Sequence, residues 1–271
     1  MQGLTKLNNK IMRKADAVAV VCNFILDELL ERATRNEEVR DYYDISVIGY
    51  SKNDITPIIP HRCDRLISIS ELAKYAPRTK EWNFEGDANN GDNVDNREAD
   101  FVLREWVKPL AEGRTPMHTA LTHIYTLVDR WCSRPENRDS FPPMVFNITD
   151  GEANDATQEE LITAAEHIRE TGTNNGNTLL INIHLGELND NDRDSWEPSK
   201  IFPSEREFEA SSAYEMTLFR MSSPMPQELE AVIEAIGSDR GRPPYRGMGF
   251  NVTPGELLYI LNIGSDSINI A

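Results

Sequence analysis

The stretch Pro143-Met-Val-Phe-Asn-Ile-Thr149, followed directly by Asp150-Gly151, decides the fold. Its apolar and β-branched residues predict a strand, and the Asp-Gly pair predicts the turn that ends this strand. A similar stretch, Thr178-Leu-Leu-Ile-Asn-Ile-His-Leu185, follows after a segment with helical features. A strand, a helix and a strand in this order predict a crossover unit with two parallel strands.

The N-terminal part of the chain predicts a helix followed by two strands. Residues 17–24 resemble a buried strand, but their apolar positions recur at three- and four-residue steps, which is the period of a helix. We therefore expect a helix over residues 12–33, with one apolar face made of Ala15, Val18, Cys22, Ile25, Leu29 and Ala33. Residues 44–50 and 55–59 predict strands that pair with each other.

Start signals predict most of the remaining helices. Thr115-Pro116 predicts an N-cap and a first helical residue for a helix over 117–132, and Thr157 with Glu160 predicts a capping box. Further helices are expected at 97–109, from Thr157 to 171, from Pro226 to Ile236, and from Thr253 to 264. The polar residues 83–97 are expected to form a surface loop, and residues 218–219 a short apolar piece.

These elements predict one α/β domain over residues 1–271. Its sheet is expected to be doubly wound and mostly parallel, with helices on both faces. We expect residues 1–185 to form the core and residues 186–271 to add C-terminal strand and helix elements and insertions. The sequence shows no internal repeat and no linker that divides the chain.

Charge and composition exclude some classes of partner. The formal net charge is −17 and no basic patch is visible, which argues against nucleic-acid binding. No stretch approaches the roughly 20 apolar residues that cross a bilayer, so no membrane association is expected. Cys22, Cys63 and Cys132 form no disulfide framework, and this predicts a cytoplasmic location.

Two polar residues are candidates for a binding site. In an open parallel sheet, ligands bind at the carboxyl ends of the strands, and Asp150 follows a predicted strand directly. Thr115 stands at a predicted helix start, where its hydroxyl could ligate a hard cation such as Mg²⁺. Two simpler interpretations remain open. Asp150 could serve as a turn former without binding a ligand, and Thr115 could serve as a helix cap without binding one.

Together these residues resemble the von Willebrand factor type A (vWA) family. Gly113-Arg-Thr115-Pro-Met-His-Thr-Ala-Leu121 is similar to the family's G-x-T-P-L-x-x-A-L segment, and Ile148-Thr-Asp150-Gly-Glu152 to its L-x-T-D-G segment. The helix at 15–33 and the strand at 44–51 resemble the family's first helix and second strand. The resemblance covers residues 1–185 best, and it implies a bacterial, Rossmann-like domain that binds proteins and is not an enzyme.

The family's metal-ion-dependent adhesion site joins an Asp-x-Ser-x-Ser motif after the first strand to a Thr and an Asp from later loops. The resemblance assigns Thr115 and Asp150 to these last two positions, with Mg²⁺ as the cofactor. No Asp-x-Ser-x-Ser motif precedes the first predicted helix, and Met1 stands where a family Met follows that motif. We therefore expect the chain to be N-terminally truncated, to lack the family's central first strand, and to bind Mg²⁺ weakly or not at all.

The resemblance implies a partner protein that completes the metal coordination with its own carboxylate. Bacterial relatives often act with AAA+ ATPases or with kinase and phosphatase systems, so such a component is the expected partner. Two other functions remain open. Asp150, Glu152 and Asp155 could form the carboxylate cluster of a magnesium-dependent hydrolase or phosphatase, or the domain could be a structural scaffold without metal.

Overall fold

The computed structural model describes residues 1–7, 10–52, 54–60, 64–75, 79–83, 100–111, 113–187, 198–235 and 241–266. The helices are α1 (Lys14–Ala33), α2 (Ile69–Lys74), α3 (Met117–Cys132), α4 (Gln158–Glu170), α5 (Ala213–Met221), α6 (Glu230–Ala235) and α7 (Pro254–Asp266), with 3-10 turns η1 (Pro135–Asn137) and η2 (Gln227–Leu229). The central sheet contains β11 (Met144–Thr149), β14 (Leu179–Leu185), β15 (Lys200–Ile201) and β16 (Met248–Val252).

The remaining strands form separate antiparallel pairs. These pairs are β1 (Leu4–Leu7) with β2 (Lys10–Arg13), β3 (Thr34–Arg35) with β4 (Glu38–Val39), β5 (Asp44–Ile45) with β8 (Ile67–Ser68), β6 (Val47–Ser51) with β7 (Asp54–Ile59), β9 (Thr79–Asn83) with β10 (Asp100–Arg104), and β12 (Gly172–Thr173) with β13 (Gly176–Asn177).

The central sheet has the strand order β11-β14-β16-β15. β11 lies parallel to β14, from Met144 opposite Leu179 to Thr149 opposite His184, and β14 lies parallel to β16. The short strand β15 adds an antiparallel edge to β16. The chain therefore has a mixed α/β architecture, as expected, and its sheet has both parallel and antiparallel pairs.

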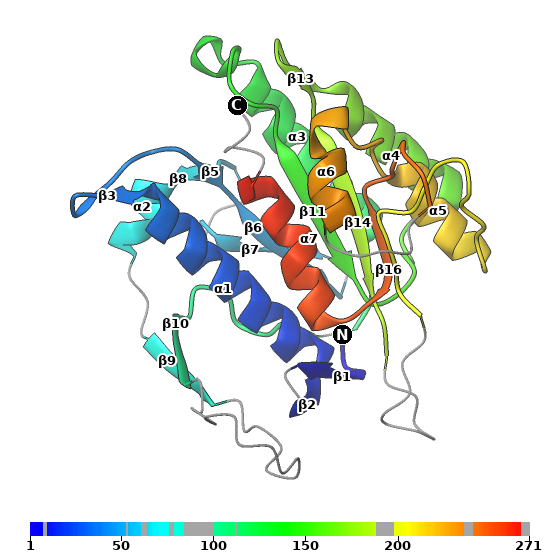
Figure 1. The fold of residues 1–271 in the computed structure, drawn as a ribbon, viewed down its shortest axis with the longest axis horizontal. Helices are drawn as coiled ribbons and strands as arrows, with labels where there is room; N and C mark the ends of the chain where they lie inside the picture. The colour runs from blue at the N-terminus through cyan, green and yellow to red at the C-terminus, as the bar shows by residue number, and fades with distance from the viewer. Residues whose placement is uncertain are drawn as a thin grey trace.

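Helices cover both faces of this sheet (Figure 1). On one face, α1, α6 and α7 pack on Ile181, Ile183 and Leu185 of β14, which are almost fully buried. On the other face, α3, α4 and α5 pack on Leu180 of β14 and Met248 of β16. Alternate residues of β14 thus enter opposite cores, which explains why its sequence is an almost continuous apolar run.

Periodicity and capping signals located several helices correctly. α1 covers most of the predicted range 12–33, and α3 matches the predicted range 117–132. Thr157 and Glu160 form the predicted capping box at the start of α4. Thr253 and Glu256 exchange the same two kinds of hydrogen bond before α7. These helices were predictable because local side-chain hydrogen bonds and one apolar face determine them.

The helix predicted at 97–109 is wrong over the described residues, because residues 100–104 form strand β10. Two side chains of α1 hold the following segment extended. Asn23 Oδ1 accepts the backbone N–H groups of Trp106 and Val107 at 2.9 and 2.8 Å, and Asp27 Oδ2 accepts that of Arg104 at 2.9 Å. Buried side-chain acceptors thus take backbone donors that a helix would use internally. The predicted surface loop at 83–97 lies almost entirely outside the described residues.

Three other predictions need smaller corrections. The strand predicted at 44–50 is divided, since β5 pairs with β8 whereas β6 pairs with β7 as expected. The short apolar piece at 218–219 belongs to helix α5, whose N-cap Ser212 accepts a hydrogen bond from Glu215 N. The helix predicted from Pro226 begins as the 3-10 turn η2 and continues as α6.

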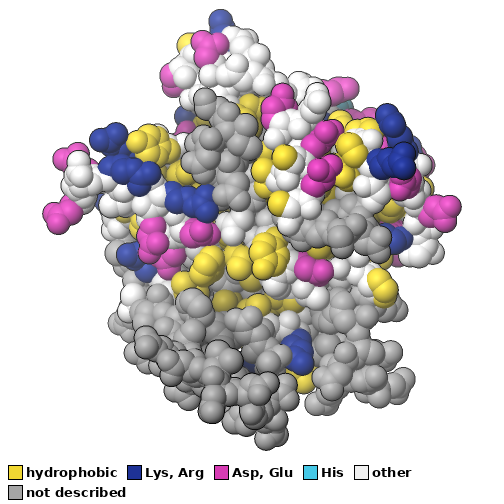
Figure 2. Space-filling view, in the orientation of Figure 1, with side chains coloured by type: hydrophobic (Ala, Val, Ile, Leu, Met, Phe, Trp, Pro, Cys, Tyr) yellow, Lys and Arg dark blue, Asp and Glu magenta, His cyan; other side chains and the backbone are white. Residues whose placement is uncertain are grey.

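The outer surface of the α1 and α7 layer is partly apolar. Figure 2 shows apolar side chains gathered across the middle of this face, and Tyr259 of α7 is 58% exposed. Charged side chains flank these apolar groups in the same view. Within the described ranges, no helix is long and apolar enough to span a lipid bilayer.

Candidate functional site

Asp150 and Thr115 lie in neighbouring loops at the carboxyl end of β11. Asp150 follows β11 directly, and the loop after it contacts the segment before α3, where Asn154 N donates to Thr115 O at 3.2 Å. The turn after β6 reaches the same end of the sheet, because Gly113 lies against Lys52. The loops that carry the two residues selected from the sequence are therefore in contact at the edge where parallel sheets bind ligands.

The predicted N-cap role of Thr115 is wrong. α3 begins at Met117, its N-cap position is Pro116, and no side chain of that position caps it. The carboxylate of Asp155 replaces the cap, since it accepts the backbone N–H groups of His118 and Thr119 at 3.2 and 2.9 Å. Because a carboxylate from the next loop satisfies the helix start, capping does not require the hydroxyl of Thr115.

The carboxylate of Asp150 forms an ion pair in this structure. The Met1 ammonium nitrogen lies 2.6 Å from Asp150 Oδ2, and both side chains are mostly buried. Hydrogen bonds on either side fix the loop. Thr149 Oγ1 donates to Gly151 O at 2.8 Å, and Tyr214 Oη donates to the same oxygen at 2.8 Å. The Asp150 carboxylate is thus presented by an ordered loop and can bind a cation.

The structure adds His184 to this end of the sheet, and sequence reasoning did not select it. His184 is the penultimate residue of β14, and its ring stacks on Phe250 at 4.7 Å and meets Tyr214 edge-on at 5.7 Å. Burial and the charge of Lys14 lower the pKa of His184 to about 4, although Asp150 and a hydrogen bond with Asn251 oppose this shift. The imidazole is therefore neutral near pH 7, and its Nδ1 has no hydrogen-bond partner among the described residues.

Protonation of His184 is expected to destabilise the fold. Its pKa rises from about 4 when folded to about 6.5 when unfolded, so the unfolded chain binds the extra proton between these values. The free energy of unfolding should fall by about 2 kcal/mol between pH 7 and pH 5. Urea unfolding of wild type and His184→Phe tests this, because the variant keeps the ring stack and should lose that pH dependence. Exposed His167→Phe should retain it, and equal slopes in wild type and His184→Phe would contradict the assignment.

A second pair of charges lies between the start of α1 and the loop after β14. Lys14, the first residue of α1, has only 3% of its side chain exposed, and its Nζ lies 3.5 Å from Glu187 Oε2. Glu187 follows β14, and its side chain is 61% exposed. The rim at the carboxyl ends of the strands therefore carries ammonium groups close to carboxylates, which suits the recognition of charged partners.

Whether the residues at this site can bind a metal ion depends on the ligand atoms that they offer. Mg²⁺ takes near-octahedral oxygen coordination, and Thr115 and Asp150 offer at most a small part of it. Among the described residues, no group of three His, Cys, Asp or Glu side chains is arranged to hold a metal ion. The carboxylate of Asp155 accepts hydrogen bonds at the start of α3. The possible hydrolase cluster of Asp150, Glu152 and Asp155 therefore does not offer three carboxylates that are all available to a metal ion.

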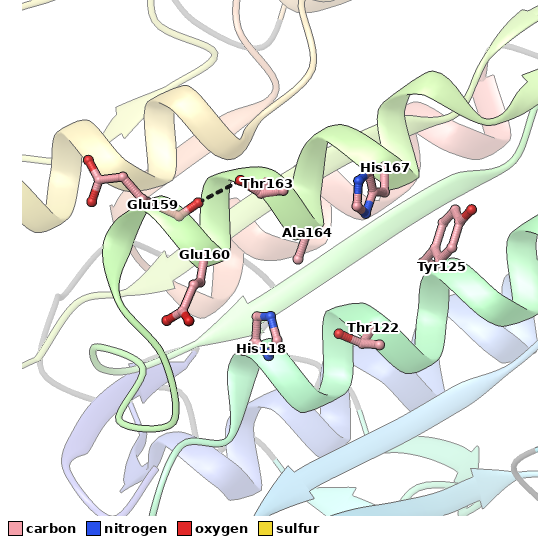
Figure 3. Close-up of a pocket in the computed structure, with 8 residues that line it drawn as sticks. All are labelled: His118, Thr122, Tyr125, Glu159, Glu160, Thr163, Ala164 and His167. Carbon is pink, nitrogen blue, oxygen red and sulfur yellow. Dashed lines mark hydrogen bonds between the residues drawn. The ribbon is translucent and has the colours of Figure 1, made fainter.

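A surface cavity of about 400 Å³ lies between α3 and α4. Figure 3 shows His118 beside Glu160 near the helix starts, and His167 beside Tyr125 further along. The Tyr125 and His167 ring centroids lie 5.6 Å apart. Because its polar groups are divided between two ends, the cavity brings no set of catalytic or metal-binding groups to one point.

Strand β11 is an edge of the central sheet. Leu179 N donates to Pro143 O, so alternate residues from Pro143 to Thr149 direct their backbone groups toward β14. Met144, Phe146 and Ile148 direct theirs the other way. Within the described part of the chain no strand pairs with that side, and Tyr50 Oη reaches Ile148 O at 3.0 Å instead.

No family model, no curated protein and no solved structure matches this chain. What the site does is therefore inferred from its residues and their geometry.

Proposed function

We propose that this chain is a non-enzymatic protein-binding domain of vWA type, whose binding end is the rim around Thr115 and Asp150. The observation that supports this most is the contact between their two loops at the carboxyl end of β11. These loops are far apart in the sequence, and the vWA resemblance assigns both residues to one metal site.

In this proposal Mg²⁺ binds only when further ligands are supplied. Asp150 contributes a carboxylate, and Thr115 contributes a hydroxyl. An Asp-x-Ser-x-Ser segment at the same rim would add the missing oxygens, and a partner carboxylate would complete the shell. The proposed partner is a component of an AAA+ ATPase or of a kinase and phosphatase system. The proposed location is the cytoplasm.

The proposal predicts that added ligands create a magnesium site. A strand-forming segment ending in Asp-Gly-Ser-Gly-Ser is fused before Met1, and Mg²⁺ binding is measured by calorimetry. The unfused chain should bind weakly or not at all, and the fusion should bind at least tenfold more tightly, which is a gain of about 1.4 kcal/mol. Asp150→Ala in the fusion should remove this gain because it deletes a charged ligand.

Two controls make the result specific. A fusion ending in Ala-Gly-Ala-Gly-Ala keeps the strand without the ligands and should bind no better than the unfused chain. Asp129→Ala removes an exposed carboxylate of α3 and should leave the gain unchanged. Micromolar binding by the unfused chain, or a gain that survives Asp150→Ala, would contradict the proposed site.

A further inference from the structure

The cavity between α3 and α4 is a groove with two chemically different ends. α3 supplies His118, Thr122 and Tyr125, whose spacing places them on one face of the helix. α4 supplies a matching set, in which Glu160 lies beside His118 and His167 lies beside Tyr125 (Figure 3). Because both sets run in the same order, the two helices are parallel along the groove, and its ends lie about 10 Å apart.

Small side chains form the middle of the groove. Thr122 and Thr163 are exposed, and Ala164 is buried beside them. These side chains are too short to fill the space between the two helices, and a cavity of about 400 Å³ results. A cavity of this size can hold a few side chains of a partner molecule.

One end of the groove is acidic. Figure 3 shows the Glu160 carboxylate directed toward α3, beside His118. The hydrogen bonds that Glu160 Oε2 accepts from Thr157 N and Thr157 Oγ1 lower the pKa of Glu160, so its carboxylate is ionised near pH 7. A carboxylate can accept about four hydrogen bonds, and the capping box uses only part of this capacity. Glu160 can therefore bind a cationic donor while it caps α4.

The arginine of each helix is directed away from this carboxylate. Arg130 of α3 donates to Asp64 O at 2.7 Å, and Arg169 of α4 donates to Ser222 O at 3.1 Å. The formal net charge of the whole chain is −17. A cationic group of a partner is therefore attracted to the acidic end of the groove, and an anionic group is repelled from it.

The other end of the groove is aromatic. The ring centroids of Tyr125 and His167 lie 5.6 Å apart, and the ring planes meet at 44°. Tyr125 is partly exposed and His167 is exposed, so both rings are accessible to a partner. Aromatic rings bury a large area against an apolar side chain. The two ends of the groove thus suit a partner that carries a cation and an apolar group about 10 Å apart.

We propose that this groove binds one helix of a partner protein, which presents an arginine to Glu160 and an apolar side chain to Tyr125 and His167. The distance between the ends corresponds to about seven residues of a helix, and residues i and i+7 lie on one helix face. Arginine suits the acidic end because its guanidinium forms bidentate hydrogen bonds with a carboxylate.

Helix dipoles determine the direction of the partner helix. α3 and α4 both begin at the acidic end of the groove, where their dipoles are positive. An antiparallel partner helix places its negative C-terminal end there, and an arginine near a helix C-terminus is itself favourable. The partner therefore carries the apolar residue first and the arginine seven residues later, with small residues between them on the same face.

The groove goes beyond the proposed function because it binds its partner without a metal ion. It lies beside the rim, since Asp155 from the loop after β11 accepts hydrogen bonds at the start of α3. The groove selects a cationic side chain, whereas the rim is proposed to select a carboxylate through Mg²⁺. Chelation of divalent cations should therefore leave binding in the groove unchanged.

The test uses the whole chain and a synthetic helical peptide, acetyl-Ser-Glu-Ala-Ala-Leu-Ala-Gln-Ala-Ala-Gln-Ala-Arg-Ala-Ala-Lys-amide. The control peptide exchanges the arginine with the nearer glutamine, which keeps composition and charge but turns the guanidinium away from the leucine face. NMR titration gives both affinities in the presence of a chelator. The first peptide should bind about 3- to 10-fold more tightly and shift the amide signals of Thr122, Thr163 and His167. Equal affinities, or no shifts at these amides, would overturn the proposal.

Two variants locate the contacts. Glu160→Gln keeps a residue that can form the capping box and should weaken binding of the first peptide about 3- to 10-fold. Glu136→Gln removes an exposed carboxylate of η1 and is the matched control, which should bind like wild type. Thr122→Trp fills the middle of the groove and should weaken binding at least tenfold. Wild-type affinity in Glu160→Gln would reject the role of its carboxylate, and wild-type affinity in Thr122→Trp would reject the groove as the site.

Discussion

Lys200→Met is expected to lower the free energy of unfolding by about 2–4 kcal/mol. Lys200 Nζ lies 2.6 Å from Oε1 of Glu215, a residue with 0% exposure. Leaving a fully buried charge without its partner costs roughly 3–5 kcal/mol. The expected loss is smaller here, since the Lys200 side chain is 38% exposed and Ser211 still donates two hydrogen bonds to Glu215 Oε2.

Chemical denaturation of three variants gives the free energy of unfolding of each. The comparison distinguishes the loss of the charge that pairs with Glu215 from the general effect of replacing a lysine by methionine. Exposed Lys108→Met is the matched control and should change stability by less than about 0.5 kcal/mol. The double variant Lys200→Met/Glu215→Gln should recover part of the loss, because it leaves no buried charge. A loss in Lys200→Met no larger than that in Lys108→Met would show that the ion pair does not stabilise the fold.

Asn182→Ala is expected to cost about 2–4 kcal/mol by breaking a buried chain of hydrogen bonds. Asn182 Oδ1 accepts from Asn147 Nδ2 at 2.9 Å, and Asn182 Nδ2 donates to Ser222 Oγ at 3.1 Å. These contacts join β11 to β14 and β14 to the end of α5. The variant leaves polar atoms of Asn147 and Ser222 buried without this partner, and it also creates a cavity.

Exposed Asn177→Ala is the control for this second variant. It removes the same atoms from a solvent-exposed hairpin and should change the free energy of unfolding by less than about 0.5 kcal/mol. Similar denaturation midpoints for Asn182→Ala and Asn177→Ala would contradict the importance of the buried chain.

The sequence predicted those elements whose causes are local. The capping box of Thr157 and the apolar face of α3 lie within single helices, so pattern and propensity locate them. Residues 100–107 were wrongly predicted as a helix because distant side chains of α1, Asn23 and Asp27, hold their backbone. β16 was missed because Met-Gly-Phe-Asn-Val has no clear alternation, and the neighbouring strand β14 determines its place.

The candidate site was only partly predictable for a similar reason. Asp150 and Thr115 were selected because short motifs mark them and both follow or precede predicted elements directly. His184 and Tyr50 were not selected, since their roles arise from long-range contacts with Phe250 and with Ile148. The cap provided by Asp155 is also non-local, and no rule about adjacent residues assigns it to α3.

The account places β11 at the edge of the sheet that the described residues form, and hydrogen exchange within this one strand tests this placement most directly. Amide protons of Val145 and Asn147 face β14, whereas those of Phe146 and Ile148 face the open side. The unbound chain should show slow exchange at the first two residues and exchange at least tenfold faster at the other two. Equally slow exchange at all four amides would contradict the account, because it would mean that the open side of β11 is already paired.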